Sequence, residues 1–596
     1  MGKKIEPYLM SVLSSRLYSI GLEMTNTMIR AARSSVMSIS RDLSTAICDR
    51  NGAVIAISHG IPVHCANMGL TVKPCFEHPE GIKPGDLFLN NSPYYGNTHH
   101  ADYTFIAPVF FGDELMFFAV AKGHQADCGN TIPSTYHATA RDKFEEGAID
   151  WPCIKIQKDY KDVPDIIAIA KNNLRIPDVW YGDYLAGVGS ARTGEKRLRE
   201  LCEEYGVDVV KDFCDAFQEY GERRIVEEIK TLPSGHWEYE IKHDGIPELL
   251  PDGVTIKIKC DIDNVNGDIT IDLRDNMDCM PCGLNMSEAT VISSTRAGVL
   301  NRLSPDIPKV EGAMKHIKVL FREGSIIGKA VYPYSASVAT TNLADRMVSG
   351  VQALFNQITE KRGICEGGAV QSPAAAVISG TDFRREEEPY VNQIFIGLTG
   401  GPGINGHDGW VTYQYPVDGG AMFWSSIEVL ERQYPFLVME DEIIPDSAAA
   451  GKFDAAPAVK CVMTPRKNPV TFAYTCDGIE NVPKGAMGGA DGYPAACWKF
   501  NIAEGEASRS ELEAFAEPVI EYGEAIVGEC SGGGGYGNPL ERDPELVVHR
   551  VREGWLSVEK ARNVYGVVVD TTKEEYTVNV SETQKLRTEL AQKDGE

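Results

Sequence analysis

Apolar side chains recur at three- and four-residue spacing in several stretches of the chain, which is the period of an amphipathic helix. The first stretch runs over residues 7–38 with no internal proline, and its pattern predicts one long helix. The same period, with strongly charged faces, predicts helices between residues 163 and 230. Further helices are predicted over residues 343–359 and near residues 557–565.

Other stretches are rich in β-branched and aromatic residues and predict strands. Residues 44–57 are interrupted by Asn51-Gly52, a dipeptide typical of tight turns, so they form a predicted hairpin. A second hairpin is predicted over residues 103–121, with its turn at Gly112-Asp113. Alternating apolar and polar residues predict short strands over residues 235–275.

The mixture of long helices and antiparallel hairpins predicts an α+β fold, a large multi-layer subunit with a β-rich C-terminal part. Its 596 residues correspond to about four domains at roughly 150 residues each. No internal repeat or low-complexity linker marks a boundary, so we divide the chain by its texture. Residues 1–232 contain the long helix and a hairpin-rich catalytic domain, and residues 233–330 form a small β-rich domain. Residues 331–572 form an α/β domain with glycine-rich loops, and residues 573–596 are a polar tail.

Composition narrows the classes of function. The chain has 58 basic and 85 acidic side chains, and its net charge of −27 repels nucleic acid. Its 15 cysteines are an odd number and too sparse for a disulfide scaffold. No apolar stretch is long enough to span a membrane, and the first residues do not resemble a secretory signal. We expect a soluble, cytoplasmic protein with reduced thiols and neither nucleic-acid nor membrane partners.

Histidines gather in one part of the chain. Seven of the 12 lie at positions 59, 64, 78, 99, 100, 124 and 137. The densest signals are Thr98-His99-His100-Ala101-Asp102 and Gly123-His124-Gln125-Ala126-Asp127, one on each arm of the second predicted hairpin. Imidazoles and carboxylates are common ligands of divalent transition metals, so these two signals indicate a candidate metal site.

The predicted hairpin brings the two signals together. With its turn at Gly112-Asp113, Asp102 lies opposite Gly123 and next to His124, and cross-strand neighbours are about 5 Å apart. The side chains expected at this end of the ribbon are His99, Asp102, His124 and Asp127. Two imidazoles and one carboxylate suit a catalytic Zn²⁺, Mn²⁺ or Fe²⁺ with an open position. The alternative is a set of hydrogen-bonded polar residues at the end of a hairpin.

Nearby candidates are less clear. His100 follows His99 and is expected to point to the other side of the chain, as a supporting or surface residue, and the role of His137 stays open. Asp42 stands between a predicted helix and a predicted strand. It is either a structural cap or a carboxylate that reaches the site and acts as a general base.

Two further patterns do not support a cofactor. Cys279-Met280-Pro281-Cys282 lacks the second pair that a thiolate zinc site needs. The glycine-rich residues 531–537 lack the Gly-Lys-Ser/Thr of a phosphate-binding loop. They predict a close approach of backbone segments instead.

The chain also carries a series of longer motifs. They are Arg41-Asp42-Leu43-Ser44, Ile61-Pro62-Val63-His64, residues 85–94, Thr98-His99-x-x-Asp102, His124-x-x-Asp127, residues 445–452 and residues 532–544. This series resembles the hydantoinase B/5-oxoprolinase family, which also contains the large metal-bearing subunits of acetone and acetophenone carboxylases. The resemblance runs nearly from end to end.

The resemblance implies a two-part enzyme. A partner subunit with an actin-like ATPase fold uses ATP and Mg²⁺ to phosphorylate the amide or enol oxygen of a small-molecule substrate, and this chain completes the reaction. The family pattern implies a divalent metal, Zn or Mn with Fe as a further option, bound by His99, Asp102 and His124, with Asp42 as the base. Residues expected to bind substrate or support the ligands are His64, Asp127, His100 and His137.

Three functions are compatible with this resemblance. The first is ATP-dependent hydrolysis of a cyclic amide, such as a hydantoin, 5-oxoproline or a lactam. The second is ATP-dependent carboxylation of a ketone of the acetone or acetophenone type, and the third is a non-catalytic scaffold. The chain departs from the amidohydrolase pattern after His99, at residues 134–140 and at residues 150–155. Because these loops are expected to line the substrate site, the sequence leaves the substrate open.

Overall fold

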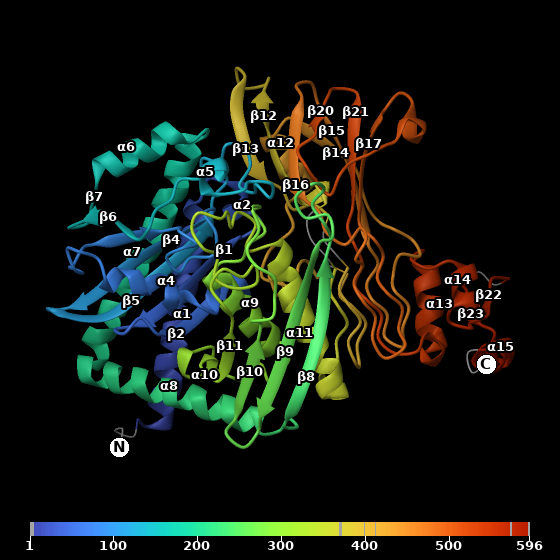
Figure 1. Cartoon of the computed structure of the whole chain (residues 1–596), viewed down its shortest axis with the longest axis horizontal. Coiled ribbons are helices and arrows are strands. Elements are labelled where there is room, and N and C mark those ends of the chain that lie inside the picture. The colour runs from blue at the N-terminus through green and yellow to red at the C-terminus, as the bar shows by residue number, and fades with distance from the viewer. Residues whose placement is uncertain (1–4, 369–371, 398–399, 412, 573–574, 594–596) are drawn as a thin grey trace.

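The helices and strands of this computed structural model form the predicted α+β fold (Figure 1). The structure describes residues 5–368, 372–397, 400–411, 413–572 and 575–593. The helices are α1 (Pro7–Ala31), α2 (Ser35–Ser38), α3 (Pro62–Cys65), α4 (Met68–Phe76), α5 (Lys143–Glu146), α6 (Pro164–Asn173), α7 (Pro177–Tyr205), α8 (Val207–Ile229), α9 (Glu288–Leu300), α10 (Glu311–Met314), α11 (Asn342–Ile358), α12 (Ile427–Gln433), α13 (Pro544–Arg552), α14 (Val558–Asn563) and α15 (Val580–Lys593). The helices predicted over residues 163–230, 343–359 and 557–565 are confirmed.

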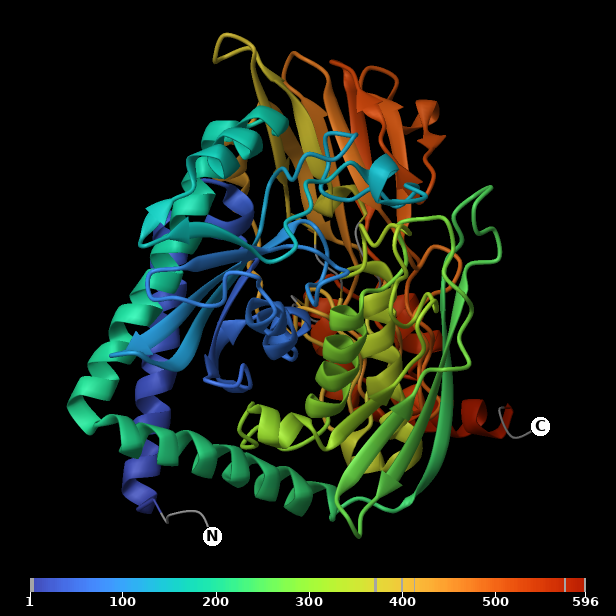
Figure 2. The same ribbon diagram turned by 60° about the vertical axis from the view of Figure 1, so that its left-hand side comes forward.

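A seven-stranded antiparallel sheet forms the N-terminal layer, in the order β2-β1-β5-β4-β3-β6-β7. Its strands are β1 (Leu43–Asp49), β2 (Val54–Gly60), β3 (Leu87–Asn90), β4 (Asp102–Phe111), β5 (Glu114–His124), β6 (Ile154–Lys158) and β7 (Lys161–Asp162). Both predicted hairpins are confirmed, since β1 pairs with β2 and β4 pairs with β5. Helices α1 and α7 run side by side over one face (Figure 2), where a Cβ on Gly187 would lie 2.2 Å from the Phe105 ring. The next residue, Ile106, points to the opposite face and packs with Val72 of α4.

The first helix is shorter than predicted. It ends at Ala31 rather than at residue 38, and an extended turn separates it from α2. The backbone N–H groups of Arg33 and Ser34 donate to the buried carboxylate of Asp183 on α7, at 2.6 and 3.1 Å. A side chain that takes backbone donors in this way competes with the helix. The interaction with Asp183 therefore redirects the chain toward β1 and Asp42.

The middle of the chain forms a four-stranded sheet. Strands β8 (Gly235–His243), β9 (Val254–Asp263) and β10 (Asp268–Asp272) are antiparallel, and β11 (Ile317–Leu320) is parallel to β10. These strands confirm the prediction for residues 235–275. Helix α11 packs closely on the sheet, because a Cβ on Gly350 would lie 2.8 Å from both Ile241 and Ile258. This packing fixes the position of α11, which carries residues of the candidate site.

Two five-stranded sheets enclose a second core in the C-terminal part. One contains β12 (Val377–Asp382), β13 (Glu388–Gln393), β16 (Val470–Thr475), β19 (Phe515–Ala516) and β20 (Val519–Ile520), and the other contains β14 (Phe436–Ile443), β15 (Val459–Pro465), β17 (Ala496–Asn501), β18 (Ser510–Glu511) and β21 (Glu524–Glu529). Phe472 from the first sheet and Ile526 from the second belong to this core. A small module of α13–α15 with β22 (Val569–Asp570) and β23 (Thr577–Val578) projects at the right of Figure 1.

Glycine-rich segments lie against one another at backbone contact. The N–H of Gly535 donates to the carbonyl of Ala490 at 2.9 Å. A Cβ on Gly535 would lie 2.3 Å from the carbonyl oxygen of Ala450, and one on Gly489 would lie 2.0 Å from the carbonyl oxygen of Gly535. The close backbone approach predicted for residues 531–537 is therefore confirmed, and glycine is the residue that permits it.

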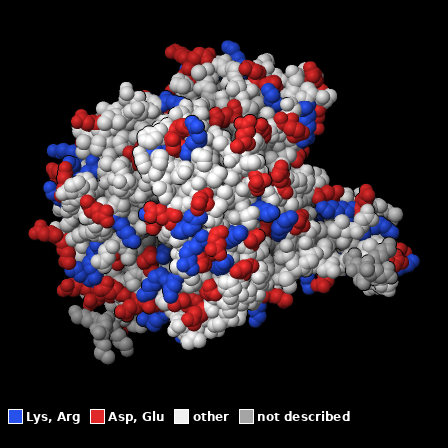
Figure 3. Space-filling view, viewed as in Figure 1, with Lys and Arg blue, Asp and Glu red and all other residues white. Residues whose placement is uncertain are grey.

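The charge of the surface and the state of the cysteines agree with what the composition predicts. Acidic side chains are spread over the face in view with basic ones between them (Figure 3). All 15 cysteines are buried free thiols. Among the described residues, no helix combines the length and the apolar character needed to cross a lipid bilayer.

Candidate metal centre

The candidate site begins where the second hairpin ends. Strand β4 starts at Asp102 and β5 finishes at His124, and these residues are direct cross-strand partners. The prediction placed Asp102 opposite Gly123, but a register shift between Val109 and Phe110 moves the pairing by one residue. The shift brings Oδ1 of Asp102 to 3.4 Å from Nδ1 of His124.

His99 joins the cluster from the turn before β4. Its Nδ1 lies 2.9 Å from the carbonyl oxygen of Ser337, and since a carbonyl only accepts, Nδ1 carries a ring proton. In the neutral ring Nε2 is then a lone pair, and it lies 3.1 Å from Oδ1 of Asp102. Two acceptor atoms at this distance are favourable only when a proton or a metal ion binds there.

The two carboxylate oxygens of the buried Asp102 have different surroundings. Oδ2 accepts from the Thr98 hydroxyl and lies 3.1 Å from Nε2 of His64. Oδ1 has no hydrogen-bond donor, although it faces His99 and His124. Burial raises the pKa of the Asp102 carboxyl, but the neighbouring imidazoles outweigh burial and hold the pKa well below its ordinary value.

His64 is oriented by a short chain of hydrogen bonds. The backbone N–H of Ile61 donates to the hydroxyl oxygen of Ser44 at 3.0 Å, and this hydroxyl lies 3.2 Å from Nδ1 of His64. When the Ser44 hydroxyl donates its hydrogen bond to Nδ1, the hydrogen of the neutral His64 ring is on Nε2 and points to Asp102. Burial lowers the pKa of His64, which favours the neutral ring. His64 is therefore placed as the partner that holds Asp102 in position.

These residues fit a divalent transition metal. The ligand atoms of His99, Asp102 and His124 lie within 4.8 Å of one another, and all three residues are buried. Oδ1 of Asp102 and Oδ1 of Asp42 are buried oxygens without a donor. Such oxygens are costly unless a cation binds beside them. Two imidazoles and a carboxylate also form a ligand set suited to zinc, manganese or iron.

Asp42 lies at the edge of this cluster. Its Oδ2 is 3.8 Å from Nδ1 of His124, and its Oδ1 is 4.0 Å from Nε2 of His64. Burial first, and then the charges of Asp102 and Asp418, raise the pKa of the Asp42 carboxyl. A carboxylate with a raised pKa is a stronger base, as general-base catalysis requires.

Three predicted supporting residues lie elsewhere. The His100 ring is turned to Glu146, with Nδ1 2.7 Å from Oε1. Asp127 accepts from the backbone N–H of Arg175, and His137 is half-buried on the neighbouring loop. The structure brings His64 to the ligand atoms but not these three residues, whose roles in substrate binding stay predictions.

The sequence did not single out two side chains behind the cluster. Thr98, which precedes His99, binds Asp102 through its hydroxyl. Nζ of the buried Lys122 lies 3.4 Å from the Thr98 hydroxyl, and burial lowers the pKa of this lysine to about 8. Lys122 lies two residues before His124 on β5, and side chains two residues apart on a strand point to the same face of the sheet. This spacing is the signal in the sequence that could have placed Lys122 beside the site.

A small cavity opens beside Asp42 and His124. It has a volume of about 30 Å³, room for roughly two water molecules, so its walls must move apart to admit anything larger. Tyr136, from the predicted substrate loop 134–140, lines it and covers the imidazoles, with its ring centroid 6.0 Å from that of His99 and 5.5 Å from that of His124. Ile61, Val63 and His64 form part of the remaining wall, and the C-terminal half supplies the rest, namely Thr340, Thr341, Asp345, Phe395, Tyr415, Val417, Asp418 and Met422. Sequence reasoning missed this C-terminal part of the wall because its residues are far from the histidines and belong to no metal motif.

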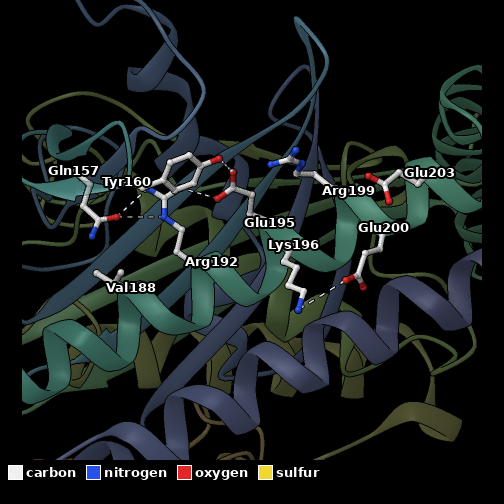
Figure 4. A pocket seen from close by; sticks show the side chains of 9 residues that line it. All are labelled: Gln157, Tyr160, Val188, Arg192, Glu195, Lys196, Arg199, Glu200 and Glu203. Carbon is white, nitrogen blue, oxygen red and sulfur yellow. Dashed lines mark hydrogen bonds and ion pairs between the residues drawn. The ribbon is translucent and has the colours of Figure 1, made fainter.

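A larger surface groove of about 610 Å³ follows α7 (Figure 4). Four of its charged side chains form ion pairs: Arg192 pairs with Glu195 at 2.7 Å, and Lys196 pairs with Glu200 at 4.0 Å. None of the predicted site residues lines it. The chemistry therefore points to the small cavity rather than to this groove.

The chain belongs to the Hydantoinase B/oxoprolinase family, whose model matches residues 6–539. It is 27% identical to caprolactamase subunit beta of Pseudomonas jessenii over 583 residues, which cover 95% of this chain and 97% of that protein. The crystal structure of ATP-dependent caprolactamase from Pseudomonas jessenii has a TM-score of 0.87 at 24% identity, over 98% of this chain and 100% of that chain. The nucleotide-free structure of acetone carboxylase has a TM-score of 0.86 at 18% identity, over 99% of this chain and 83% of that chain. Both likenesses show a shared fold.

Proposed function

We propose that this chain is the metal-bearing catalytic subunit of an ATP-dependent enzyme that hydrolyses a cyclic amide, such as a hydantoin, 5-oxoproline or a lactam. The observation that carries the proposal is the buried cluster of His99, Asp102 and His124, in which one Asp102 oxygen has no donor. The similarity to caprolactamase subunit beta over 95% of this chain supports a cyclic amide as the substrate.

In this proposal a partner subunit uses the ATP. An actin-like ATPase subunit, with Mg²⁺, phosphorylates the amide oxygen, and the phosphorylated intermediate then passes to this chain. The name of the similar protein, a subunit beta, supports a second polypeptide. The Asp102 and His124 end of the hairpin is where the intermediate would meet this chain's catalytic groups.

The residues of the site have separate roles in the reaction. His99, Asp102 and His124 would hold a divalent ion, with zinc or manganese expected and iron as a further option. When bound, such an ion supplies Lewis acidity that acidifies water and stabilises negative charge on oxygen. Asp42 takes a proton from the attacking water, because its carboxyl borders the cavity and burial makes it more basic. Tyr136, with its ring over the imidazoles, limits the access of bulk water.

Ketone carboxylation is the second candidate, because acetone carboxylase shares the fold over 99% of this chain. The complex of this chain with its ATPase partner separates the two reactions when ATP consumption is measured with hydantoin, 5-oxoproline, caprolactam, acetone and acetophenone, each with and without bicarbonate. We expect ring opening that does not depend on bicarbonate. ATP consumption that requires a ketone together with bicarbonate would favour the carboxylase instead.

A scaffold role is tested by metal content and activity together. We expect the purified wild-type chain to contain one divalent transition metal, and His99→Ala and His124→Ala to lose both the metal and the activity of the complex. A metal-free wild-type chain, with full activity in both alanine variants, would show that the chain is a scaffold.

A further inference from the structure

The cavity contains a second pair of buried carboxyl groups to which the mechanism above gives no role. Asp345, in the first turn of α11, and Asp418 both line it, and they are 2% and 4% exposed. The adjacent Arg346 does not neutralise them, because its guanidinium pairs with Asp477 at 2.6 Å. Two carboxyl groups are thus buried beside the candidate metal site with no cation assigned to them.

Each of the two carboxyl groups has an oxygen without a hydrogen bond. Oδ1 of Asp345 accepts from the backbone N–H of Val417 at 2.9 Å, whereas Oδ2 of Asp345 and Oδ2 of Asp418 are buried without a donor. The hydroxyl of Tyr415, which is 3% exposed and lines the same cavity, also has no partner. Buried polar groups are normally hydrogen-bonded, so these three groups indicate a ligand that supplies the missing bonds.

The charge of the substrate decides which of its atoms fits here. In the proposed reaction the substrate carbon carries a phosphorylated oxygen, an attacking water and the ring nitrogen. Carboxyl groups disfavour the phosphate and a developing oxyanion, whereas the nitrogen takes the electron pair of the breaking C–N bond and needs a proton, which a protonated carboxyl group can donate. We propose that Asp345 and Asp418 form the subsite for the ring nitrogen of the cyclic amide and protonate it as the C–N bond breaks. The inference rests on the proposed function.

The surroundings of the pair support proton donation. Burial raises the pKa of both carboxyl groups well above the ordinary value, and the charge of Asp345 raises that of Asp418 further. A raised pKa favours the protonated form of each carboxyl group, and the repulsion between two buried negative charges favours keeping a proton on one of them. Asp345 is held on a helix, and Asp418 lies in a turn whose next residue, Gly419, would place a Cβ 2.8 Å from Pro62. The two groups are therefore positioned by parts of the chain that pack against the site.

The site of proton delivery decides which bond breaks. Water adds to the phosphorylated carbon as Asp42 takes one of its protons and passes it to the imidate nitrogen, which gives a tetrahedral centre that bears a hydroxyl, the phosphoryl oxygen and the amine nitrogen. When the C–N bond breaks, its electron pair stays on nitrogen, which takes the carboxyl proton, while Asp42 takes the hydroxyl proton. The products are an amine and an acyl phosphate, which a second water hydrolyses to carboxylate and phosphate.

The competing path breaks the bond to phosphate. Phosphate leaves with the electron pair, the cyclic amide forms again with an oxygen from water, and ATP is consumed without product. Phosphate is the better leaving group unless the nitrogen is protonated. The pair Asp345 and Asp418 would therefore couple ATP consumption to ring opening.

The test uses the complex of this chain with its ATPase partner in water labelled with ¹⁸O, with hydantoin, 5-oxoproline and caprolactam as probes. The measured quantities are ATP consumed, ring-opened product, and ¹⁸O in the recovered amide. The variants are Asp345→Asn, Asp418→Asn and Tyr415→Phe. Asp183→Asn is the matched control, because Asp183 is also buried, accepts from backbone N–H groups, has one oxygen without a donor and lies outside the cavity lining.

We expect the ratio of ATP consumed to product to rise by about 10²-fold in Asp345→Asn or Asp418→Asn, with ¹⁸O accumulating in the recovered amide. Tyr415→Phe, which removes one hydroxyl, should raise the ratio less but in the same direction. The ratio should keep its wild-type value in Asp183→Asn. If an asparagine variant does not fold, the ATP-to-product ratio of Tyr415→Phe and the ¹⁸O in its recovered amide still test whether the subsite protonates the ring nitrogen.

Several outcomes would overturn the subsite alone. One is a wild-type complex that opens a probe while both asparagine variants and Tyr415→Phe keep its ATP-to-product ratio. Another is a parallel loss of ATP consumption and product in folded variants, with no label in the recovered amide. A third is two divalent ions per wild-type chain that fall to one in the variants, which would make the pair a second cation site. A wild-type complex that opens none of the probes overturns the proposed function, and the subsite with it.

Discussion

The Nδ1 of His99 donates to the carbonyl of Ser337 at 2.9 Å, although 238 residues separate them. This hydrogen bond selects the ring tautomer and turns Nε2 toward Asp102. The hairpin therefore carries the candidate ligands, while a segment of the C-terminal half sets the orientation of one of them. A second partner of this kind is typical of histidines that bind metals.

Asp102→Asn should remove the bound metal. The neutral amide provides a weaker oxygen ligand and cannot balance the charge of the ion. Elemental analysis should find less than about one tenth of the wild-type content, and a chelator should lower the thermal midpoint of the wild type but not of the variant. His236→Asn is the control, because His236 is exposed and pairs with Asp261 on the surface at 2.8 Å. A variant that keeps its metal contradicts the assignment of Asp102.

His64→Ala should weaken metal binding by about 10- to 100-fold without abolishing it. The substitution removes the Nε2 donor that faces Oδ2 of Asp102 at 3.1 Å. Competition with a chelator of known affinity measures the loss, and Ser44→Ala should give a smaller change in the same direction. If His64→Ala loses the metal as completely as His99→Ala, His64 is itself a ligand.

Asp42→Asn should lower kcat by about 10²- to 10⁴-fold and leave the metal content unchanged, because the substitution removes the base. Burial raises the pKa of Asp42, so the wild-type rate should fall as the pH drops through a value above the ordinary range of a carboxyl. A pH profile of kcat/KM should lack this acidic limb in the variant. Metal loss on substitution would instead make Asp42 a ligand.

The buried pair of His100 and Glu146 should make stability depend on pH. Burial lowers the pKa of His100, but Glu146 outweighs burial and raises it; burial raises the pKa of Glu146, but His100 outweighs burial and lowers it. A raised histidine pKa stabilises the fold at pH values below about 6.5, and this contribution is lost as the pH rises through the folded pKa. A lowered glutamate pKa stabilises above about 4.3, and this contribution is lost as the pH falls through the folded pKa.

The pair therefore contributes most between about pH 4.3 and 6.5. Glu146→Gln should lower the free energy of unfolding by about 3 kcal/mol near pH 5.5, and by less at pH 9. Urea denaturation at the two pH values measures the difference. Glu145→Gln, at the partly exposed neighbouring position where Glu145 pairs with Arg141, should change the free energy of unfolding equally at the two pH values. Equal destabilisation by Glu146→Gln at both pH values would show that the pair is not charged in the folded protein.

Gly535→Ala should destabilise the protein by about 1–3 kcal/mol, because its Cβ would lie 2.3 Å from the carbonyl oxygen of Ala450. The matched control is Gly189→Ala on α7, where the nearest atom to a Cβ is 3.7 Å away. Alanine favours a helix interior, so this control should stabilise by about 0.5–1 kcal/mol. Urea midpoints compare the two, and equal midpoints would contradict steric contact at Gly535.

Local signals in the sequence predicted much of the fold. The turn at Gly112-Asp113 and the strand pattern on each side of it placed Asp102 and His124 together, because a hairpin is set by nearby residues. The one-residue error came from the bulge, since an extra residue in a strand leaves no signal in the apolar pattern. The end of α1 depends on the carboxylate of Asp183, which is remote in sequence.

The C-terminal residues of the cavity wall could not be predicted from the sequence, because they too depend on contacts between segments that are remote in sequence. Asp345 lies on a predicted helix, and Asp418 precedes two glycines, which are both ordinary contexts for aspartate. Their burial arises only when α11 and the loop of residues 413–418 pack against the hairpin. Residues that acquire a role through packing of distant segments cannot be recognised from their neighbours.

The bond between His99 and Ser337 bears on how the protein matures in the cell. A ribosome delivers His99, Asp102 and His124 well before it delivers Ser337, so the nascent chain displays all three candidate ligands before the hydrogen bond that selects the His99 tautomer can form. Selectivity among divalent ions depends on ligand geometry. If these residues bind a metal, we therefore expect the finished polypeptide, and not the emerging one, to discriminate among divalent ions.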